Sequence, residues 1–106
     1  MSIPIPTDLK NFVNQRGLFE GCTRNDSPGY VVLWPIEDIP KCNAQIEMET
    51  YAPGFLAFAG NGGGEVLAFD AAGAVYMLPL VGLGPDEAIR VASSFAEFAG
   101  TFELDD

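Results

Sequence analysis

The chain has 106 residues, the size of one small domain, and 48% of them are hydrophobic, which is enough to build a core. Fifteen acidic against five basic residues give a net charge of −10, which argues against nucleic acid or an anionic membrane as partner because both are bound by clustered Lys and Arg. Histidine is absent, which excludes His-based acid–base catalysis, His-activated nucleophiles and imidazole metal ligands.

The first predicted element is a helix over residues 4–17. Leu9, Phe12 and Val13 follow the i, i+3, i+4 spacing, so they would form one apolar face. Gly17 then ends the helix.

A loop and a strand are predicted next. Residues 21–29 are polar and rich in turn formers, which favours a loop, whereas the apolar run 30–34 is typical of a strand buried on both faces. Pro35 ends this strand, and residues 36–39 predict a short helical turn. The acidic stretch 41–49 fits either a helical turn or an irregular loop.

A glycine-rich hairpin occupies the middle of the chain. Residues 55–59 and 65–70 read as antiparallel strands joined by a tight connection. Ordering consecutive glycines costs entropy, so they are expected where the backbone needs a positive φ or a close approach, in a strand connection or a bulge. These glycines are Gly62, Gly63 and Gly64.

Another strand is predicted over residues 74–80, after a short turn at 71–73. Pro79 indicates that the strand ends at a sheet edge or has already left the ladder, because proline lacks an N–H donor. Residues 86–92 fit either a short helix or an extended segment.

A capping box starts the last predicted helix. Ser94 can accept from the N–H of Glu97, whose carboxylate would reach back to the serine N–H. The helix would pack Phe95, Phe98 and Phe102, and residues 103–106 would form a frayed acidic tail.

Motifs for cofactors and catalysis are not found. Gly64 is followed by Glu65 and not by Lys-Ser/Thr, so the glycine turn is no phosphate loop, and no EF-hand spacing occurs. Cys22 and Cys42 are too few and too far apart for a zinc motif; two reduced thiols are expected, with a single disulfide left open. No cofactor, no metal and no catalytic residue are predicted.

Targeting signals are absent as well. No apolar run approaches the ~20 residues of a membrane span, and the N-terminal region lacks the pattern of a signal peptide. A cytoplasmic protein without a membrane partner is therefore expected. Trp34 has two interpretations, a filler of the core or an anchor at a partner-binding groove.

An ordered set of motifs resembles the SUKH superfamily, the Smi/Knr-like group of small α+β domains. The motifs, which cover nearly the whole chain as a single domain over residues 1–106, are IPTDLKNF, YVVLWPIEDI, YAPGFL, GNGGGE, FD and VASSFAEF. The resemblance implies an α+β domain, with a mostly antiparallel sheet of about five or six strands flanked by an N-terminal, a short middle and a C-terminal helix. It also implies that Gly62, Gly63, Gly64, Ser94 and Phe95 are structural.

The resemblance further implies a non-catalytic role. Bacterial members look like immunity proteins that bind a toxin domain, often a nuclease, and an acidic protein could imitate the phosphate substrate of such a basic target. The alternatives are a regulatory or scaffolding adaptor, and a carboxylate-based hydrolase or small-ligand binder. The residues predicted to contact the partner are Trp34, Glu37, Asp38, Glu47, Glu49, Glu65, Asp70, Asp86 and Glu87.

Overall fold

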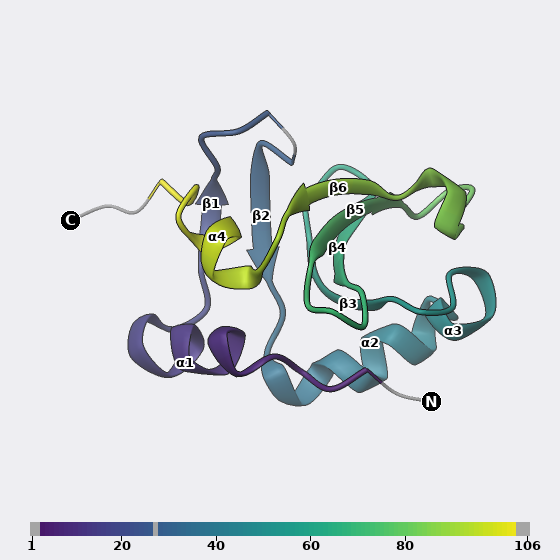
Figure 1. Ribbon diagram of the computed structural model, residues 1–106, viewed down its shortest axis with the longest axis horizontal. Coiled ribbons are helices and arrows are strands. Elements are labelled where there is room, and N and C mark those ends of the chain that lie inside the picture. The colour runs from purple at the N-terminus through teal and green to yellow at the C-terminus, as the bar shows by residue number, and fades with distance from the viewer. Residues whose placement is uncertain (1–2, 27, 104–106) are drawn as a thin grey trace.

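A six-stranded antiparallel sheet forms the centre of the protein in a computed structural model, which describes residues 3–26 and 28–103 (Figure 1). Strands adjacent in the chain are also adjacent in the sheet, as short connections favour. The strands are β1 Glu20–Cys22, β2 Tyr30–Leu33, β3 Leu56–Gly60, β4 Glu65–Phe69, β5 Val75–Pro79 and β6 Ile89–Ala92.

Helices flank the sheet on several sides. Figure 1 shows α1 and α4 beside β1 and β2, α2 running below the curled part of the sheet, and α3 at the far end. The helical elements are α1 Thr7–Arg16, α2 Ile39–Gln45, α3 Met48–Tyr51 and α4 Phe95–Ala99, with 3-10 turns η1 Ile36–Asp38 and η2 Pro85–Glu87. The α+β fold with N-terminal, middle and C-terminal helices is therefore confirmed.

Strand β1 lies within the stretch predicted as a loop, so that prediction was wrong at residues 21 and 22. Pairing on both sides holds this short polar strand. One side pairs with β2; on the other, the N–H of Glu103 donates to the carbonyl of Cys22 (2.9 Å), and the N–H of Arg24 donates to that of Thr101 (2.7 Å). The strand depends on partners distant in the chain, which the local sequence does not reveal. Of the predicted acidic tail, residues 104–106 lie outside the described residues.

Strand β2 is buried on one face, so the prediction of burial on both faces was wrong. Val31 and Leu33 are buried, while Tyr30 and Val32 are half-buried. The Tyr30 hydroxyl donates to the exposed Glu20 carboxylate on β1 (2.7 Å), and this hydrogen bond is the main cause of the raised pKa of Tyr30. The Glu20 carboxylate thus provides a polar partner on a face that is only partly covered.

The stretch 41–49, which the sequence left open, is mostly helical and is joined to the sheet by Asn43. The Asn43 side chain accepts from the N–H of Ala57 (2.8 Å) and donates to the carbonyls of Ala57 (2.8 Å) and Ile39 (2.7 Å). The amide thereby pairs with the β3 backbone in the way a neighbouring strand would, at a point where β2 no longer does.

Asn61 organises the glycine connection between β3 and β4. Its Oδ1 atom accepts from the N–H groups of Gly63 (2.8 Å) and Glu65 (3.1 Å), and its Nδ2 atom donates to the Glu65 carboxylate (2.8 Å). Gly62 and Gly64 have φ values of 75° and 92°, so the expectation of positive φ is confirmed at two of the three glycines. The run is a strand connection and not a bulge, because the β3 register shift lies between Ala57 and Ala59.

Two sequence signals, Pro79 and the capping box at Ser94, can be compared with the end of β5 and the start of α4. Pro79 is the final residue of β5 and still pairs with Glu65 of β4, so the prediction that the strand has left the ladder holds only on the β6 side. The N–H of Glu97 donates to Ser94 Oγ (3.1 Å), which confirms half of the capping box. The other half was wrong by one residue, because the Glu97 carboxylate accepts from the N–H of Ser93 (2.9 Å).

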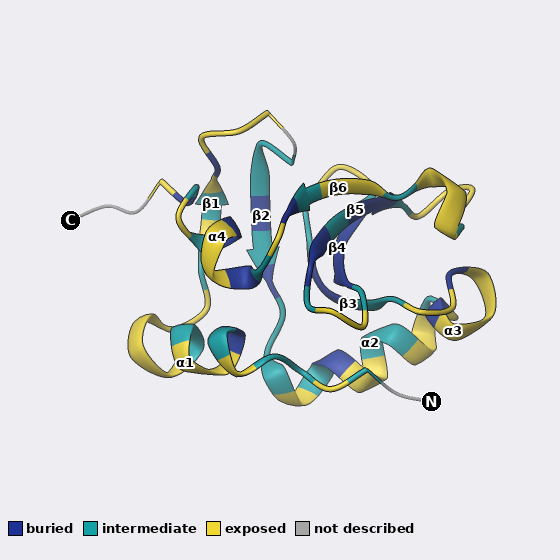
Figure 2. Ribbon diagram, in the orientation of Figure 1, coloured by how far each residue is buried: buried dark blue, intermediate teal, exposed yellow. Residues whose placement is uncertain are grey.

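Two hydrophobic clusters lie on the sheet, and β3, β4 and β5 carry residues of both (Figure 2). Adjacent residues of a strand point to opposite faces, so Ala57 joins one cluster and Phe58 the other. The register shift between Ala57 and Ala59 then lets Ala59 join the same cluster as Phe58. The phenylalanine cluster has as its largest side chains Phe58, Phe69, Phe95, Phe98 and Phe102. The alanine cluster consists of Met48, Ala52, Ala57, Val66, Ala68 and Leu78.

Candidate protein-binding surface

Charge is distributed unevenly along the chain. Between Cys42 and Ile89 there is no Lys or Arg, whereas the same stretch carries six carboxylates. Long-range attraction of a basic partner would therefore be strongest where this stretch reaches the surface. The six are Glu47, Glu49, Glu65, Asp70, Asp86 and Glu87.

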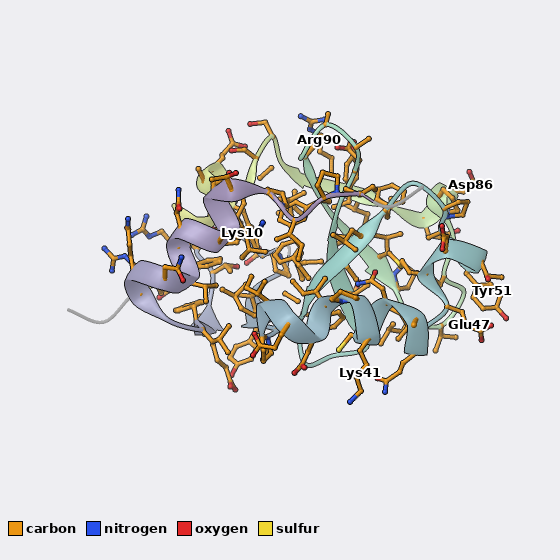
Figure 3. The ribbon with its side chains drawn as sticks, turned by 90° about the horizontal axis from the view of Figure 1, so that it is seen from below. Lys10, Lys41, Glu47, Tyr51, Asp86 and Arg90 are labelled. Carbon is orange, nitrogen blue, oxygen red and sulfur yellow. The ribbon has the colours of Figure 1, made fainter. Side chains whose placement is uncertain are left out.

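Four of these carboxylates come from two segments that meet at one end of the molecule. The backbone of Gly84, next to η2, approaches the carbonyl of Tyr51 in α3, since a Cβ atom on Gly84 would lie 3.9 Å from it. Figure 3 shows Glu47, Tyr51 and Asp86 together at this end. The acidic end is defined here as Glu47, Glu49, Tyr51, Asp86 and Glu87, all of which are exposed.

Exposed apolar side chains lie in α3 and in the region from the end of β5 to the start of β6. Among the described residues, four of the five large hydrophobic side chains that are exposed come from α3 or the β5–β6 region. Val81 is 92% exposed and Tyr51 is 52% exposed. Aromatic and aliphatic side chains surrounded by charges are typical of protein-binding surfaces, because the apolar groups supply affinity and the charges supply steering.

The basic residues lie away from the acidic end. In Figure 3, Lys10 lies on α1, Lys41 points outward from α2, and Arg90 lies at the top of the view, whereas Glu47, Tyr51 and Asp86 lie at its right. Arg16 belongs to the last turn of α1, and Arg24 follows β1.

The other predicted carboxylates are not brought to the acidic end. Glu37 and Asp38 form η1, at the opposite end of α2 from α3. Glu65 accepts from Asn61, and Asp70 Oδ1 accepts from the N–H groups of Ala72 (2.9 Å) and Ala74 (3.0 Å), so both lie in turns at opposite ends of β4. Their contact with a partner stays a prediction.

Trp34 is half-buried just after β2 and packs against both hydrophobic clusters. Its ring nitrogen lies 3.8 Å from the position that a Cβ atom on Gly60 would take. This packing favours the interpretation as a filler of the core, while its role as an anchor stays untested.

A groove lies beside the acidic end, between the N-terminal segment and the α2–α3 helices. Its volume is about 560 Å³. Apolar side chains of Ile3, Ile5, Phe55 and Leu56 contribute to its lining, and Glu47 and Glu49 are among the charged residues that line it. We call it the α2–α3 groove.

The acids of the α2–α3 groove are poorly suited to catalysis. Glu47 and Glu49 are both exposed, and Thr23 is the only buried polar or charged residue in the described part of the chain. General acid–base chemistry by carboxylates relies on burial or close charge partners to shift a pKa. The hydrolase alternative therefore gains no support from this geometry.

Cys22 and Cys42 are free thiols, which agrees with the expected reduced state. Within residues 3–26 and 28–103, no three His, Cys, Asp or Glu residues are grouped to hold a metal ion. No helix in the described part of the chain is long and apolar enough to cross a membrane.

Tyr51, Val81 and Asn43 were not singled out from the sequence. An exposed apolar residue has no signature of its own, because the same residue type fills the core. The acidic run around Glu47 and Glu49 was the available signal for this surface. It predicts the carboxylates, but it does not indicate which apolar residues lie beside them.

The fold and motifs agree with a comparison against protein families, in which the SMI1 / KNR4 family (SUKH-1) matches residues 1–100. The chain belongs to this family. The resemblance inferred from the motifs is thereby confirmed. Among curated proteins, none matches the sequence. The family membership agrees with a protein-binding role of the immunity type and leaves the partner open.

Proposed function

We propose that this SUKH-1 protein is an immunity protein, which binds a basic toxin domain of nuclease type and covers its substrate-binding surface. The observation that carries the proposal is the acidic end, where four carboxylates and an exposed tyrosine come together from α3 and η2. Membership of the SUKH-1 family supports the same role.

Inhibition would be steric and electrostatic. A nuclease surface that binds phosphate carries Lys and Arg, so a surface of carboxylates at the acidic end is complementary to it. Tyr51 would supply apolar contact within the interface, since tyrosine is enriched among residues that dominate binding energy. No chemical step by the immunity protein is required.

Co-expression with the product of the neighbouring gene tests the proposal. The two proteins should co-purify, and this protein should restore growth of cells that express the toxin domain. Failure of a basic toxin domain to bind or be neutralised would contradict the proposal. Binding of a housekeeping protein in its place would identify the alternative adaptor role.

Charge-matched variants locate the surface. Asp86→Asn with Glu87→Gln should weaken toxin binding about tenfold and reduce its salt dependence. The control, Asp26→Asn with Glu103→Gln, removes the same two charges from exposed positions outside the acidic end. Equal weakening by both pairs would show that net charge alone is responsible and that the acidic end is not the binding surface.

A further inference from the structure

We propose that the connection between β5 and β6 is the apolar anchor of the interface, and that Leu80 and Val81 at its tip enter an apolar pocket that lies beside the basic surface of the toxin domain. Residues 80–84 are called the β5–β6 loop here. The inference rests on the proposed function and deepens it, because it names the side chains that are buried on binding and the kind of partner surface that receives them.

The tip of the β5–β6 loop presents apolar side chains to solvent. Among the described residues, Val81 is the most exposed of the large hydrophobic side chains, at 92%, and its neighbour Leu80 is 41% exposed. Figure 2 shows much of the connection between β5 and β6 as exposed. Burial of the tip in a partner would therefore remove nearly the whole apolar surface of Val81 from water, which favours association.

The fold itself makes little use of these two side chains. Neither Leu80 nor Val81 is part of the phenylalanine cluster or the alanine cluster, whereas Leu83 in the same loop packs against the alanine cluster. A polar residue would satisfy a turn at this position equally well. Exposed apolar side chains beside charged ones are typical of interaction surfaces.

Contacts at both ends of the β5–β6 loop hold its tip in place. At one end, the N–H of Leu80 donates to the carbonyl of Gly64 in the glycine connection (2.9 Å). At the other end, Leu83 is half-buried against the alanine cluster, and the backbone of Gly84 approaches the carbonyl of Tyr51. A loop that is held in this way loses less conformational entropy on binding, so more of the apolar contact contributes to affinity.

Charges beside the loop favour a basic partner over a second copy of this chain. Asp86 and Glu87 follow the loop in η2 and are exposed, and residues 80–88 contain no Lys or Arg. In a symmetric dimer the same patch would face itself, so the carboxylates of the two copies would repel each other. An anionic membrane would be repelled as well. A domain with Lys and Arg around an apolar pocket would instead place opposite charges next to these carboxylates.

Serine substitutions at exposed apolar positions test the anchor, with the toxin domain encoded by the neighbouring gene as the probe. Val81→Ser should weaken binding about tenfold or more, mainly through faster dissociation, because the charges and not the apolar tip steer the encounter. The salt dependence of its affinity should stay that of the wild type, in contrast to Asp86→Asn with Glu87→Gln.

Leu18→Ser is the matched control for Leu80→Ser. The two leucines are similarly exposed, at 48% and 41%, but Leu18 lies between α1 and β1, away from the acidic end. Leu80→Ser should weaken toxin binding and Leu18→Ser should not. Equal weakening by both would overturn the proposal, because any exposed leucine would then have the same effect.

The outcomes for Val81→Ser separate the inference from the proposed function. The variant should keep the wild-type unfolding temperature, because the side chain it shortens is almost fully exposed. Unchanged toxin affinity of this variant would overturn the anchor and leave the proposed function standing. Failure of the wild-type protein to bind the toxin domain would overturn both.

Sedimentation of the free protein tests a second copy as the occupant. We expect a monomer at low and at high salt. A dimer that Val81→Ser dissociates would overturn the proposal, because the tip of the loop would then be covered by another copy of this chain.

Discussion

The two hydrophobic clusters of this protein differ in the size of their side chains. The phenylalanine cluster joins α1, α4 and the sheet through a network of edge-to-face and stacked rings, among them Phe58 stacked on Phe69 with centroids 4.2 Å apart. The alanine cluster includes three alanines among its six buried residues and lies beneath the acidic end. We therefore expect the phenylalanine cluster to contribute more to the stability of the fold, and the alanine cluster to support a surface that tolerates substitution.

Removal of a ring from the phenylalanine cluster has the largest expected effect. Phe98→Ala should lower the free energy of unfolding by about 3–5 kcal/mol, because it leaves a cavity among well-packed rings. Phe98 is fully buried and contacts Phe58, Phe95 and Phe102. Urea unfolding measures the loss.

The matched variant in the other region is Phe55→Ala, since Phe55 packs partly against the alanine cluster. It should cost less than half as much, because Phe55 is only half-buried. Equal losses for the two variants would break the contrast between the clusters.

Asn43→Ala tests the connection between α2 and β3. Two buried backbone groups of Ala57 would lose their partner, so the free energy of unfolding should fall by about 2–4 kcal/mol. Gln45→Ala is the control, because Gln45 is exposed on the same helix. Similar small losses for both variants in urea unfolding would show that the amide does not act as a strand neighbour.

Glu47→Gly should separate stability from binding. Glu47 has a left-handed backbone with a φ of 55°. Relief of this conformation should raise the free energy of unfolding by up to about 1 kcal/mol, while the loss of the carboxylate should weaken toxin binding. Thermal unfolding and a binding titration on the same sample measure the two effects. A variant that is both less stable and equally tight in binding would contradict the assignment of Glu47 to function.

The smallest expected effect concerns pH. Hydrogen bonds from the N–H and hydroxyl groups of Ser93 lower the pKa of Glu97, so the charged form is favoured in the folded protein. This contribution is fully present above the ordinary pKa of a glutamate and is lost as pH falls through the lowered value. The unfolding temperature of Glu97→Gln should therefore fall less than that of the wild type between neutral pH and about pH 3.

Local patterns predicted most of the architecture. The apolar spacing around Leu9, the glycine hairpin and the capping serine at Ser94 each depend on neighbours within a few residues, and the structure places α1, β3–β4 and α4 there. Strand β1 and the bonds of Asn43 were missed because they depend on segments about 14 to 80 residues away in the chain.

The binding surface was only partly accessible from the sequence. Its carboxylates could be named from composition, but α3 and η2 are brought together by the fold, as the approach of Gly84 to Tyr51 shows. The left-handed conformation of Glu47 had no signal either, because glycine or asparagine would be expected there.

The edges of the sheet bear on how a partner can be held. Val91 of β6 falls at a register shift and has no opposite residue on β5, its neighbour Arg90 adds a charge, and the outer side of β1 is occupied by residues 101–103 of the same chain. Bulged, charged or covered edges discourage the addition of a foreign strand. The proposed partner would then be held by side chains and not by backbone ladders, so specificity could change by substitution, one surface position at a time, while the sheet stays as it is.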